Sequence, residues 1–484
     1  MNALVIVANR LPVQVGTSGE LEPSPGGLVS AMKSVTEEGT QWIGWGGPST
    51  HGIGELQIGD LRAHPVTLSE QEESRYYAGF ANSVLWPLFH GRLKREELNR
   101  AWWRTYRQVN ERFASLAVRV TPLGGTVWIH DYHLLLAAEM IRTRRADLKI
   151  GFFLHIPFPA VQLFSTLPWR ERILDGMLGA DLIGFQTHDD LANFQATVER
   201  LLDAKLSSDS VQYEGRRVHT DVFPISVDFD HWDQLGRSVV EEAAELRVEF
   251  GGDHVYLGVD RLDYSKGIIE RLKAFGELLD EGWLDPSRAR FVQIAVPSRT
   301  DIEAYREVRK AVEDLVDRVN TTHNRPDGTG PILYMDTSLD DHGLAVHYRA
   351  ADSLVVSSFA DGMNLVAKEF VATRNDLDGT LILSEFAGAA QDLPEALLIN
   401  PFDLEAIKRA MRDACEMPAE QRAERMTAMR ETVRAHDVHR WAHDFLHRLD
   451  EVASAPTRGG RLRRRLRPIA LPAWPGFRGL ARGS

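Results

Sequence analysis

Residues 255–267 read VYLGVDRLDYSKG, an apolar run that leads into a loop with two cations, Arg261 and Lys266. A helical pattern follows at Ile268–Glu281 and a second apolar run follows at Phe291–Val296. Short, almost continuously apolar runs are typical of parallel strands that helices cover on both faces. The stretch therefore predicts a β–α unit of a doubly wound sheet, with both cations at the carboxyl end of a strand.

The same alternation of apolar runs and helical patterns extends through most of the chain and predicts an α/β fold. It pauses between about 206 and 250, where we expect an acidic helix at Val239–Phe250 and, near 230–240, a junction between two domains. The expected strands are 3–8, 126–130, 149–154 and 181–185 before the junction, and 255–259, 291–296, 332–335, 353–357, 380–384 and 396–400 after it.

Two doubly wound domains follow from this pattern, over residues 1–235 and 236–437. A chain of 484 residues is about three times as long as a typical domain, which agrees with more than one. A helix over 438–456 follows the last strand, and we expect it to pack across the junction. The tail over 457–484 carries eight arginines and no acidic residue, which predicts disorder. It is either a solvated appendage or a segment attracted to an anionic partner.

Composition argues against several classes of protein. The single cysteine, Cys415, rules out an intramolecular disulfide and favours a reducing compartment, so we expect a cytoplasmic protein. The apolar start lacks the basic residues and cleavage site of a signal peptide, and no apolar run approaches the roughly 20 residues of a membrane span. The net charge of −13 argues against general nucleic-acid binding.

Most of the unusual polar residues follow directly on predicted strands. Ligands of doubly wound sheets bind at the carboxyl ends of strands. Two sheets whose strand ends face each other would gather these residues at a single site between the domains. The residues are Asn9, Arg10, Asp131, Tyr132, His133, His155, Arg261, Arg299 and Asp361.

Residues 361–369 read DGMNLVAKE and predict a turn followed by the start of a helix near Leu365. Free N–H groups at a helix start face phosphates or hydroxyls, and Asp361 and Glu369 accept hydrogen bonds from hydroxyl groups of a sugar and a ribose. Arg261 and Lys266 would neutralise a diphosphate. Together these residues predict a pocket for a sugar nucleotide; the alternatives are an ordinary capped helix and a surface pair of cations.

Two further groups are weaker candidates. The glycines Gly26 and Gly27 permit close approach of a backbone to a ligand, or form a plain turn. They are not part of a G-x-G-x-x-G pattern, so no dinucleotide cofactor is indicated. Two arginines suit a phosphate and two aromatic rings suit the face of a sugar, although the rings could simply pack in the core. This acceptor group consists of Arg10, Tyr77, Trp86 and Arg299.

Two patterns point to other chemistry, and we reject both. The histidines of His130–His133 and His155 lack the spacing of a zinc helix and have no cysteine nearby, so we expect no metal. Residues 376–380, DLDGT, match the motif of aspartyl-phosphate phosphatases. That chemistry needs its first aspartate at the end of a strand, whereas here a helical pattern precedes the motif. We interpret it as a loop from a helix to a strand.

Seven motifs make the chain resemble the trehalose-phosphate synthase family of retaining glycosyltransferases, from about Leu4 to about Leu449. They are Ala8–Pro12 (ANRLP), Leu85–His90 (LWPLFH), Trp128–His133 (WIHDYH), Gly151–Pro159 (GFFLHIPFP), Gly258–Gly267, Asp361–Glu369 and Leu383–Ala390 (LSEFAGAA). The resemblance implies a GT-B fold, in which two Rossmann-like domains hold an active site between them. It also implies transfer of glucose from a nucleoside diphosphate to the anomeric hydroxyl of glucose 6-phosphate, with retention.

The resemblance assigns roles by position and implies neither a metal nor a cofactor. The catalytic residues would be Arg261, Lys266, Asp361 and His155, with the cations stabilising the departing phosphate. The donor would contact Gly26, Gly27, Arg261, Lys266, Asp361, Gly362, Met363, Asn364, Leu365, Val366 and Glu369. The acceptor would contact Arg10, Tyr77, Trp86, Asp131 and Arg299.

The chain departs from the family in one place. The family usually has arginine before Asp361, and this chain has Ala360; Ser357–Phe359 also replaces the usual Thr-Pro-Leu. Two alternative functions therefore stay open, namely the same donor chemistry with another phosphorylated acceptor such as glycerol 3-phosphate, and a non-catalytic sugar-phosphate sensor. The expected partners are the two small-molecule substrates, and the sequence leaves open whether the chain forms a homo-oligomer. The donor base is open between uracil, guanine and adenine.

Overall fold

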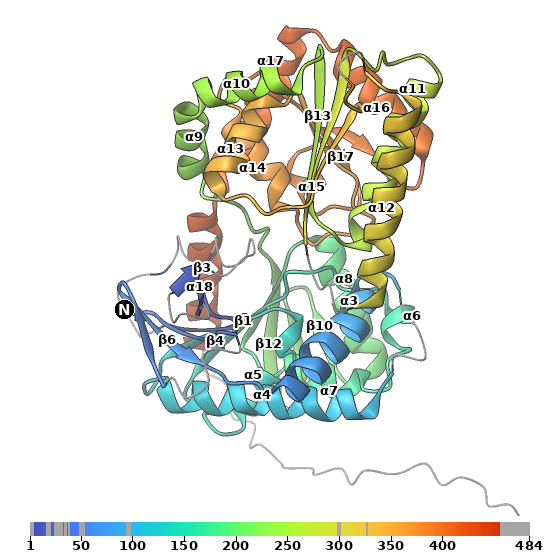
Figure 1. The fold of residues 1–484 in the computed structure, drawn as a ribbon. Coiled ribbons are helices and arrows are strands. Elements are labelled where there is room, and N and C mark those ends of the chain that lie inside the picture. The colour runs from blue at the N-terminus through green and yellow to red at the C-terminus, as the bar shows by residue number, and fades with distance from the viewer. Residues whose placement is uncertain are drawn as a thin grey trace, which may run out of the picture.

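The computed structural model describes residues 4–15, 21–23, 32, 36, 39–47, 54–92, 98–297, 302–325 and 328–454. Two large sheets form among these residues, one above the other along the length of the molecule, and helices cover both (Figure 1). The chain is an α/β protein, as predicted. Gly26, Gly27, Arg299 and the tail from 455 lie outside the described residues.

The first sheet is parallel at its centre and antiparallel at its edges. In the described residues it has ten strands in the order β10-β11-β12-β9-β8-β7-β1-β4-β6-β5. Hairpins pair β10 with β11, β11 with β12, and β5 with β6. The strands are β1 (Leu4–Arg10), β4 (Gln41–Trp45), β5 (Leu56–Ile58), β6 (Leu61–Pro65), β7 (Thr126–His130), β8 (Lys149–Phe153), β9 (Leu182–Phe185), β10 (Lys205–Ser207), β11 (Ser210–Tyr213) and β12 (Arg216–Val222).

The second sheet is parallel throughout its described strands, in the order β15-β14-β13-β16-β17-β18. The sequence predicted every one of these strands. They are β13 (His254–Arg261), β14 (Ala289–Val296), β15 (Ile332–Met335), β16 (Ser353–Val356), β17 (Thr380–Ser384) and β18 (Leu397–Ile399).

Helices cover the faces of both sheets (Figure 1). With the first sheet lie α2 (Glu70–Glu72), η2 (Glu73–Leu85), α3 (Trp86–Phe89), α4 (Arg100–Val120), η4 (Tyr132–Leu134), α5 (Ala137–Arg142), α6 (Val161–Phe164), α7 (Arg170–Met177) and α8 (His188–Leu201). The later helices are α9 (Phe229–Ser238), α10 (Val240–Phe250), η5 (Tyr264–Lys266), α11 (Ile268–Asp280), α12 (Glu303–Thr322), α13 (Asp341–Ala350), α14 (Leu365–Thr373), α15 (Ala389–Asp392), α16 (Leu404–Glu416), α17 (Ala419–Ala435) and α18 (Val438–Ser454).

The prediction that the strand pattern pauses at 206 was wrong, because β11 and β12 follow directly. β11 has four residues, and β12 carries polar side chains at five of its seven positions. An edge hairpin is half-exposed, so it lacks the continuous apolar run that marks a buried parallel strand.

One helix element is unusual. Helix η2 has π-type hydrogen bonding over 13 residues and carries Tyr77 toward the first sheet's strand ends. The short helix α2, which leads directly into η2, begins with a capping box in which Ser69 and Glu72 bond each other's backbone and side chain. Wide helical turns of this kind are rare and frequently occur at functional sites.

The last helix, α18, packs on the first sheet although the second sheet precedes it in the chain. The ring of Trp441 lies 5.0 Å from Trp128, and that of Phe445 lies 4.8 Å from the same tryptophan. Trp441 Nε1 also donates to the carbonyl of Phe223, at 3.1 Å. At Gly151 of β8 a Cβ would come within 2.7 Å of Phe445, so a glycine is needed there for the helix to approach the strand. The domain limits at 235, 437 and 456 stay a prediction.

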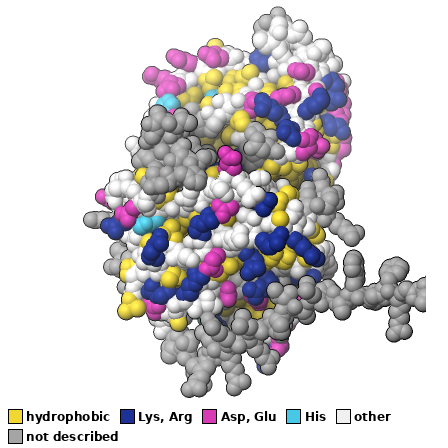
Figure 2. Space-filling view, turned by 60° about the horizontal axis from the view of Figure 1, so that its bottom comes forward, with side chains coloured by type: hydrophobic (Ala, Val, Ile, Leu, Met, Phe, Trp, Pro, Cys, Tyr) yellow, Lys and Arg dark blue, Asp and Glu magenta, His cyan; other side chains and the backbone are white. Residues whose placement is uncertain are grey.

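Charge is unevenly spread over the surface. Lys and Arg side chains gather on the lower part of the face in Figure 2, which belongs to the first sheet's layer. Helix α10 by contrast exposes Glu241, Glu242, Glu245 and Glu249. Among the described helices, none is both long and apolar enough to cross a membrane.

We expect Trp441→Ala to lower the free energy of unfolding by about 3–5 kcal/mol, because it removes a large buried ring and leaves a cavity against Trp128. Urea unfolding followed by tryptophan fluorescence would measure the change. The control is His443→Ala on the outer side of α18, where the side chain is 74 % exposed and the change should stay within about 0.5 kcal/mol. Equal stability of the two variants would contradict the packing described for α18.

Candidate active site

The two predicted cations lie at the end of β13, as the sequence indicates. Arg261 is the last residue of the strand, and Lys266 closes the short helix η5. Gly267 follows with φ of +60°, and a Cβ there would overlap the carbonyl of Ser357. The loop is therefore held against the loop that follows β16. Ser357 Oγ donates to the carbonyl of Gly267 at 2.7 Å, and the Phe359 amide donates to that of Ser265 at 2.8 Å.

Lys266 and Asp361 form a buried ion pair. Lys266 Nζ lies 2.5 Å from Asp361 Oδ2, across 95 residues of sequence. The same oxygen accepts hydrogen bonds from Ser358 Oγ at 3.3 Å and from Asn364 Nδ2 at 3.0 Å. Burial opposes the charged form, but the lysine and these donors outweigh it and hold the pKa of Asp361 below its usual range. Asp361 is therefore a charged acceptor at neutral pH.

The turn 361–364 fits between two other backbones. A Cβ at Gly362 would overlap the carbonyl of His155, and a Cβ at Gly388 would overlap the carbonyl of Gly362. Asn364 has φ of +77°, and its side chain accepts from the Ala367 amide at 3.0 Å, which caps α14. The turn thus brings the start of α14 against the loop after β8 of the first sheet.

Glu369 lies one turn into α14, and its carboxylate has a partner that the sequence did not indicate. Tyr348 of α13 donates to Glu369 Oε2 at 2.8 Å. Burial raises the pKa of Glu369 to about 7, although the Tyr348 hydrogen bond works in the other direction. The group is therefore poised between its charged and neutral forms near neutral pH. Its neighbour Lys368 points elsewhere, to the carbonyl of Ile225 and to Asp392.

A fully buried arginine supports the cation loop from behind. Arg271 of α11 bonds Asp260 at 2.6 Å, Gln293 at 2.9 Å and Ser357 at 3.3 Å. At Gly258 a Cβ would come within 2.6 Å of the Gln293 side chain, so a glycine is needed there. The sequence did not indicate this network. The available signal was an arginine among the apolar residues of the helix 268–281.

The acceptor candidates of the first sheet stack in a row. The Arg10 guanidinium lies 5.0 Å from the ring of Trp45 and 5.3 Å from that of Tyr77. Tyr77 in turn stacks on His133 at 5.8 Å, with 11° between the ring planes. Trp45 and His133 were not predicted as members of this group.

Asp131 sits at the end of this row. Its Oδ2 lies 3.9 Å from Nδ1 of His133, and its Oδ1 accepts from the His155 amide at 3.3 Å. Its φ is +72°, which is unusual for a residue with a side chain and is held by a hydrogen bond from its own amide to the Phe153 carbonyl. Such strain concentrates at functional sites.

Trp86 joins the two groups. The guanidinium of Arg261, from the second sheet, lies 5.2 Å from the Trp86 ring of the first. His90 packs on the same ring at 4.0 Å and bonds the Trp86 carbonyl at 2.7 Å. Burial lowers the pKa of His90 to about 4, in a field to which Asp263, Lys266 and Asp361 contribute. His90 was missed; its place four residues after Trp86 on one helix was the available signal.

His155 is turned toward His130. Its Nε2 lies 3.0 Å from His130 Nδ1, and burial lowers the pKa of His155 to about 3. The side chain is half-buried, at the edge of the site.

One group of three carboxylates among the described residues could hold a metal ion by geometry, but Lys408 already lies among them. The carboxylates are Glu277, Glu281 and Glu405, at 3.4, 2.6 and 2.6 Å from Lys408 Nζ.

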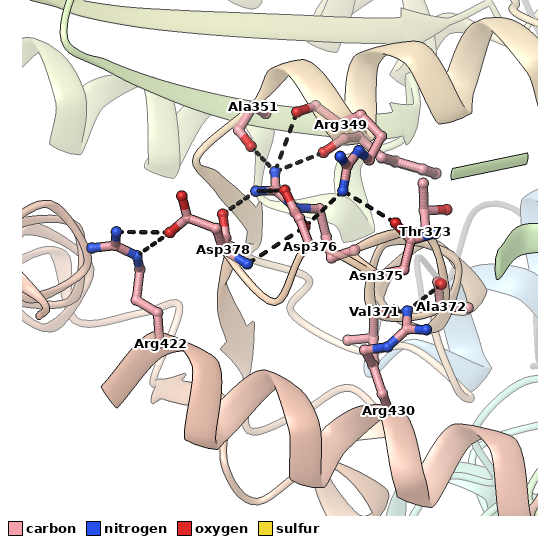
Figure 3. Close-up of polar contacts among 12 residues, drawn as sticks. Arg349, Ala351, Val371, Ala372, Thr373, Asn375, Asp376, Asp378, Arg422 and Arg430 are labelled. Atoms are coloured by element: carbon pink, nitrogen blue, oxygen red, sulfur yellow. Dashed lines mark hydrogen bonds and ion pairs between the residues drawn. The ribbon is translucent and has the colours of Figure 1, made fainter. Parts of the chain in front are cut away.

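The phosphatase-like motif is a loop between α14 and β17, as predicted (Figure 3). Asp376 pairs with Arg374 at 3.0 Å and with Arg349 at 2.8 Å. Asp378 pairs with Arg422 at 2.7 Å. Both aspartates are thus neutralised by structural arginines, and neither stands at the end of a strand.

The other predicted donor residues surround the 361–364 turn. Met363 is buried in the core, whereas Leu365 and Val366 are half-buried at the start of α14. Ala360 is half-buried beside Asp361, and the adjacent Phe359 ring packs 4.7 Å from Phe402.

The chain is similar to known proteins over nearly its whole length. The sequence profile of glycosyltransferase family 20 matches residues 2–451. A trehalose-6-phosphate synthase of Mycolicibacterium gilvum is 44 % identical over 476 residues, which covers 93 % of each chain.

Solved structures are similar over nearly the whole chain. A UDP-forming α,α-trehalose-phosphate synthase from Burkholderia xenovorans, in complex with glucose 6-phosphate, has a TM-score of 0.85 at 33 % identity and covers 93 % of this chain and 100 % of that one. An Escherichia coli protein bound with UDP-2-fluoro glucose has a TM-score of 0.84 at 33 % identity, covering 93 % of this chain and 99 % of that one. The family profile and the relatives cover nearly the whole chain, and this chain belongs to glycosyltransferase family 20.

Proposed function

We propose that this protein transfers glucose from UDP-glucose to glucose 6-phosphate, with retention at the anomeric carbon, and releases trehalose 6-phosphate and UDP. The observation that carries the proposal is the meeting of Arg261, Lys266 and Asp361 with Trp86, where the ends of both sheets come together. The synthases to which the chain is similar support the same donor and acceptor.

The donor is assigned to the second sheet. Arg261 and Lys266 hold the diphosphate, and the charged Asp361 accepts hydrogen bonds from the glucose hydroxyls. The amides at the start of α14, with Gly362, Met363, Asn364, Leu365 and Val366 around them, face the sugar and phosphate. Glu369 takes the ribose hydroxyls. Gly26 and Gly27 are assigned to the donor by position alone.

The acceptor is assigned to the first sheet. Arg10 binds the 6-phosphate, and Arg299 is expected to add a second guanidinium. The hexose is held by Tyr77, Trp86 and Asp131. These residues offer two aromatic faces and a carboxylate to a sugar ring with several hydroxyls. A three-carbon acceptor would leave these contacts unused, so hexose phosphate is the better match.

The mechanism follows from the absence of a free nucleophile at the described site. Asp361 is bonded by three donors, which makes it a poor nucleophile and a good anchor. The acceptor hydroxyl attacks C1 on the face that the diphosphate leaves, so the new C–O bond forms as the C1–phosphate oxygen bond breaks. The acceptor proton passes to the departing phosphate oxygen. Arg261 and Lys266 stabilise the charge that develops there, so the proposal requires no metal and no cofactor.

The test of the function is a panel of substrates on the purified protein. UDP-, GDP- and ADP-glucose are each combined with glucose 6-phosphate and with glycerol 3-phosphate, and products are identified by mass and by anomeric NMR couplings. We expect an α,α-linked disaccharide phosphate from UDP-glucose and glucose 6-phosphate. Products only with glycerol 3-phosphate, or no turnover with any pair, would overturn the proposal. The single cysteine favours a reducing compartment, so we place the enzyme in the cytoplasm.

Lys266→Ala and Arg261→Ala should each lower kcat by roughly 10²-fold or more, because each removes a cation that acts on the leaving group. Steady-state assays at saturating substrates would measure this. Lys310→Ala is the matched control, since that lysine is exposed on α12 and pairs with Asp314. Near-normal turnover of the two site variants would refute the assignment.

Donor binding should strengthen as pH rises through the pKa of Glu369, about 7 in the free protein. Ribose hydroxyls donate to the carboxylate better than to the acid, so binding favours the charged form and releases a proton. Below the pKa the Kd for UDP-glucose should rise up to about tenfold for each pH unit, by calorimetry from about pH 6 to about pH 8. In Glu369→Gln this dependence should vanish; its persistence would assign it to another group.

Arg10→Ala should raise the apparent KM for glucose 6-phosphate by about tenfold to 100-fold and leave that for UDP-glucose nearly unchanged, because a charge-assisted contact to phosphate is lost. Arg10→Lys keeps the positive charge but loses the bidentate contact, so its apparent KM for glucose 6-phosphate should lie between those of wild type and Arg10→Ala. Arg62→Ala, an exposed arginine paired with Glu55, is the control. Arg299→Ala should act in the same direction as Arg10→Ala. An effect confined to the nucleotide would move either arginine to the donor side.

A further inference from the structure

Two histidines meet at the ends of neighbouring strands of the first sheet, beside the turn 361–364. His130 ends β7 and His155 follows β8, and Nδ1 of the first lies 3.0 Å from Nε2 of the second. The two rings are stacked, with centroids 5.3 Å apart. Burial lowers the pKa of His155 to about 3 and that of His130 well below its usual value, so both rings are neutral at physiological pH. A single proton therefore lies between them, and one ring must donate it.

The surroundings of His130 are apolar. The residue has no exposed surface, and its ring lies 4.6 Å from that of Trp128, which itself packs on Trp441 and Phe445. Its second nitrogen, Nε2, is buried, and no described residue forms a hydrogen bond with it. His155 differs, because it is half-buried at the edge of the site, and no described group bonds its Nδ1. Only the outer ring can reach a ligand.

Two arrangements of protons are possible. If His155 donates from Nε2, the proton of His130 must sit on its own Nε2, where a buried N–H would have no acceptor. If His130 donates from Nδ1, its Nε2 carries no proton, so no N–H is left unpaired in the apolar surroundings of His130. The remaining N–H then lies on half-buried His155, at the edge of the site. Buried N–H groups without a partner are rare and cost about 1–3 kcal/mol, so the second arrangement is favoured. His155 then carries its one proton on Nδ1, because the bond at one ring nitrogen sets the state of the other.

We propose that His130 is a positioning residue that holds His155 in the tautomer with its proton on Nδ1, so that His155 presents a hydrogen-bond donor to the donor sugar. The sugar atom opposite His155 must then be an acceptor oxygen, and His155 does not act as a base. The proposal rests on the proposed function for the identity of the ligand. The tautomer itself is a property of the free protein.

Asparagine and aspartate at position 130 form a matched pair of equal size. His130→Asn can still donate toward His155 Nε2 and should keep kcat/KM for UDP-glucose within about threefold of wild type. His130→Asp, once ionised, can only accept, which moves the proton of neutral His155 to Nε2. Its kcat/KM should fall at least about tenfold relative to His130→Asn as pH rises from about 6 to about 9, because at low pH a proton shared by the pair restores a donor. Identical pH profiles of the two variants would overturn the proposal.

Two further measurements separate this role from simple packing and from the proposed function. In a His155→Gln background the choice between Asn and Asp at 130 should no longer matter, since His130 acts through His155. Independently, 15N NMR of the histidine-labelled free protein, assigned by the loss of signals in His155→Gln, should show a protonated Nδ1 and an unprotonated Nε2 for His155. A protonated Nε2 on His155 would contradict the proposed tautomer even if the enzyme makes the expected product. The expected spectrum would confirm the tautomer even if the substrate panel gave no product.

Discussion

The backbone of Gly362 lies against the carbonyl group of His155, and this contact is the constraint on which the rest of the site depends. It admits no Cβ, so the turn after β16 and the loop after β8 approach as closely as two backbones can. Because no side-chain rotamer takes part, the distance cannot be adjusted locally. This contact fixes the positions of Asp361 and Asn364 on one side and of Asp131 and His155 on the other.

The buried cations of this frame, Lys266 and Arg271, are both paired with carboxylates. Lys266 is bound by Asp361, and Arg271 by Asp260 with two neutral partners. Buried ion pairs add little net stability, because desolvation offsets their attraction. Their value here is a fixed electrostatic field around the place where a diphosphate would leave. Arg261 instead lies over the face of Trp86, where it is oriented without being neutralised.

Sequence reasoning found most of the strands and the polar residues that follow them, but it found few of their partners. Arg271 and Tyr348 were missed because each supports a predicted residue from a different element. A lone arginine in an apolar helix, or a tyrosine in α13, looks like a surface or core residue until its contact is known. The strands β11 and β12, which lie next to the edge strand β10, were missed because half-exposed hairpins carry no continuous apolar run.

The sequence by itself determined the family, the α/β fold and which polar residues stand at the strand ends. These follow from local periodicity and from long, specific motifs, and both can be recognised in a sequence without knowledge of how the chain packs. Only the tertiary structure decided that Lys266 pairs with Asp361, that Arg261 lies on Trp86 and that His130 bonds His155. It also decided that burial places the pKa of Glu369 near 7 while that of Asp361 is lowered. Pairings and desolvation depend on how strand ends from two sheets are packed together, and a one-dimensional pattern does not contain that information.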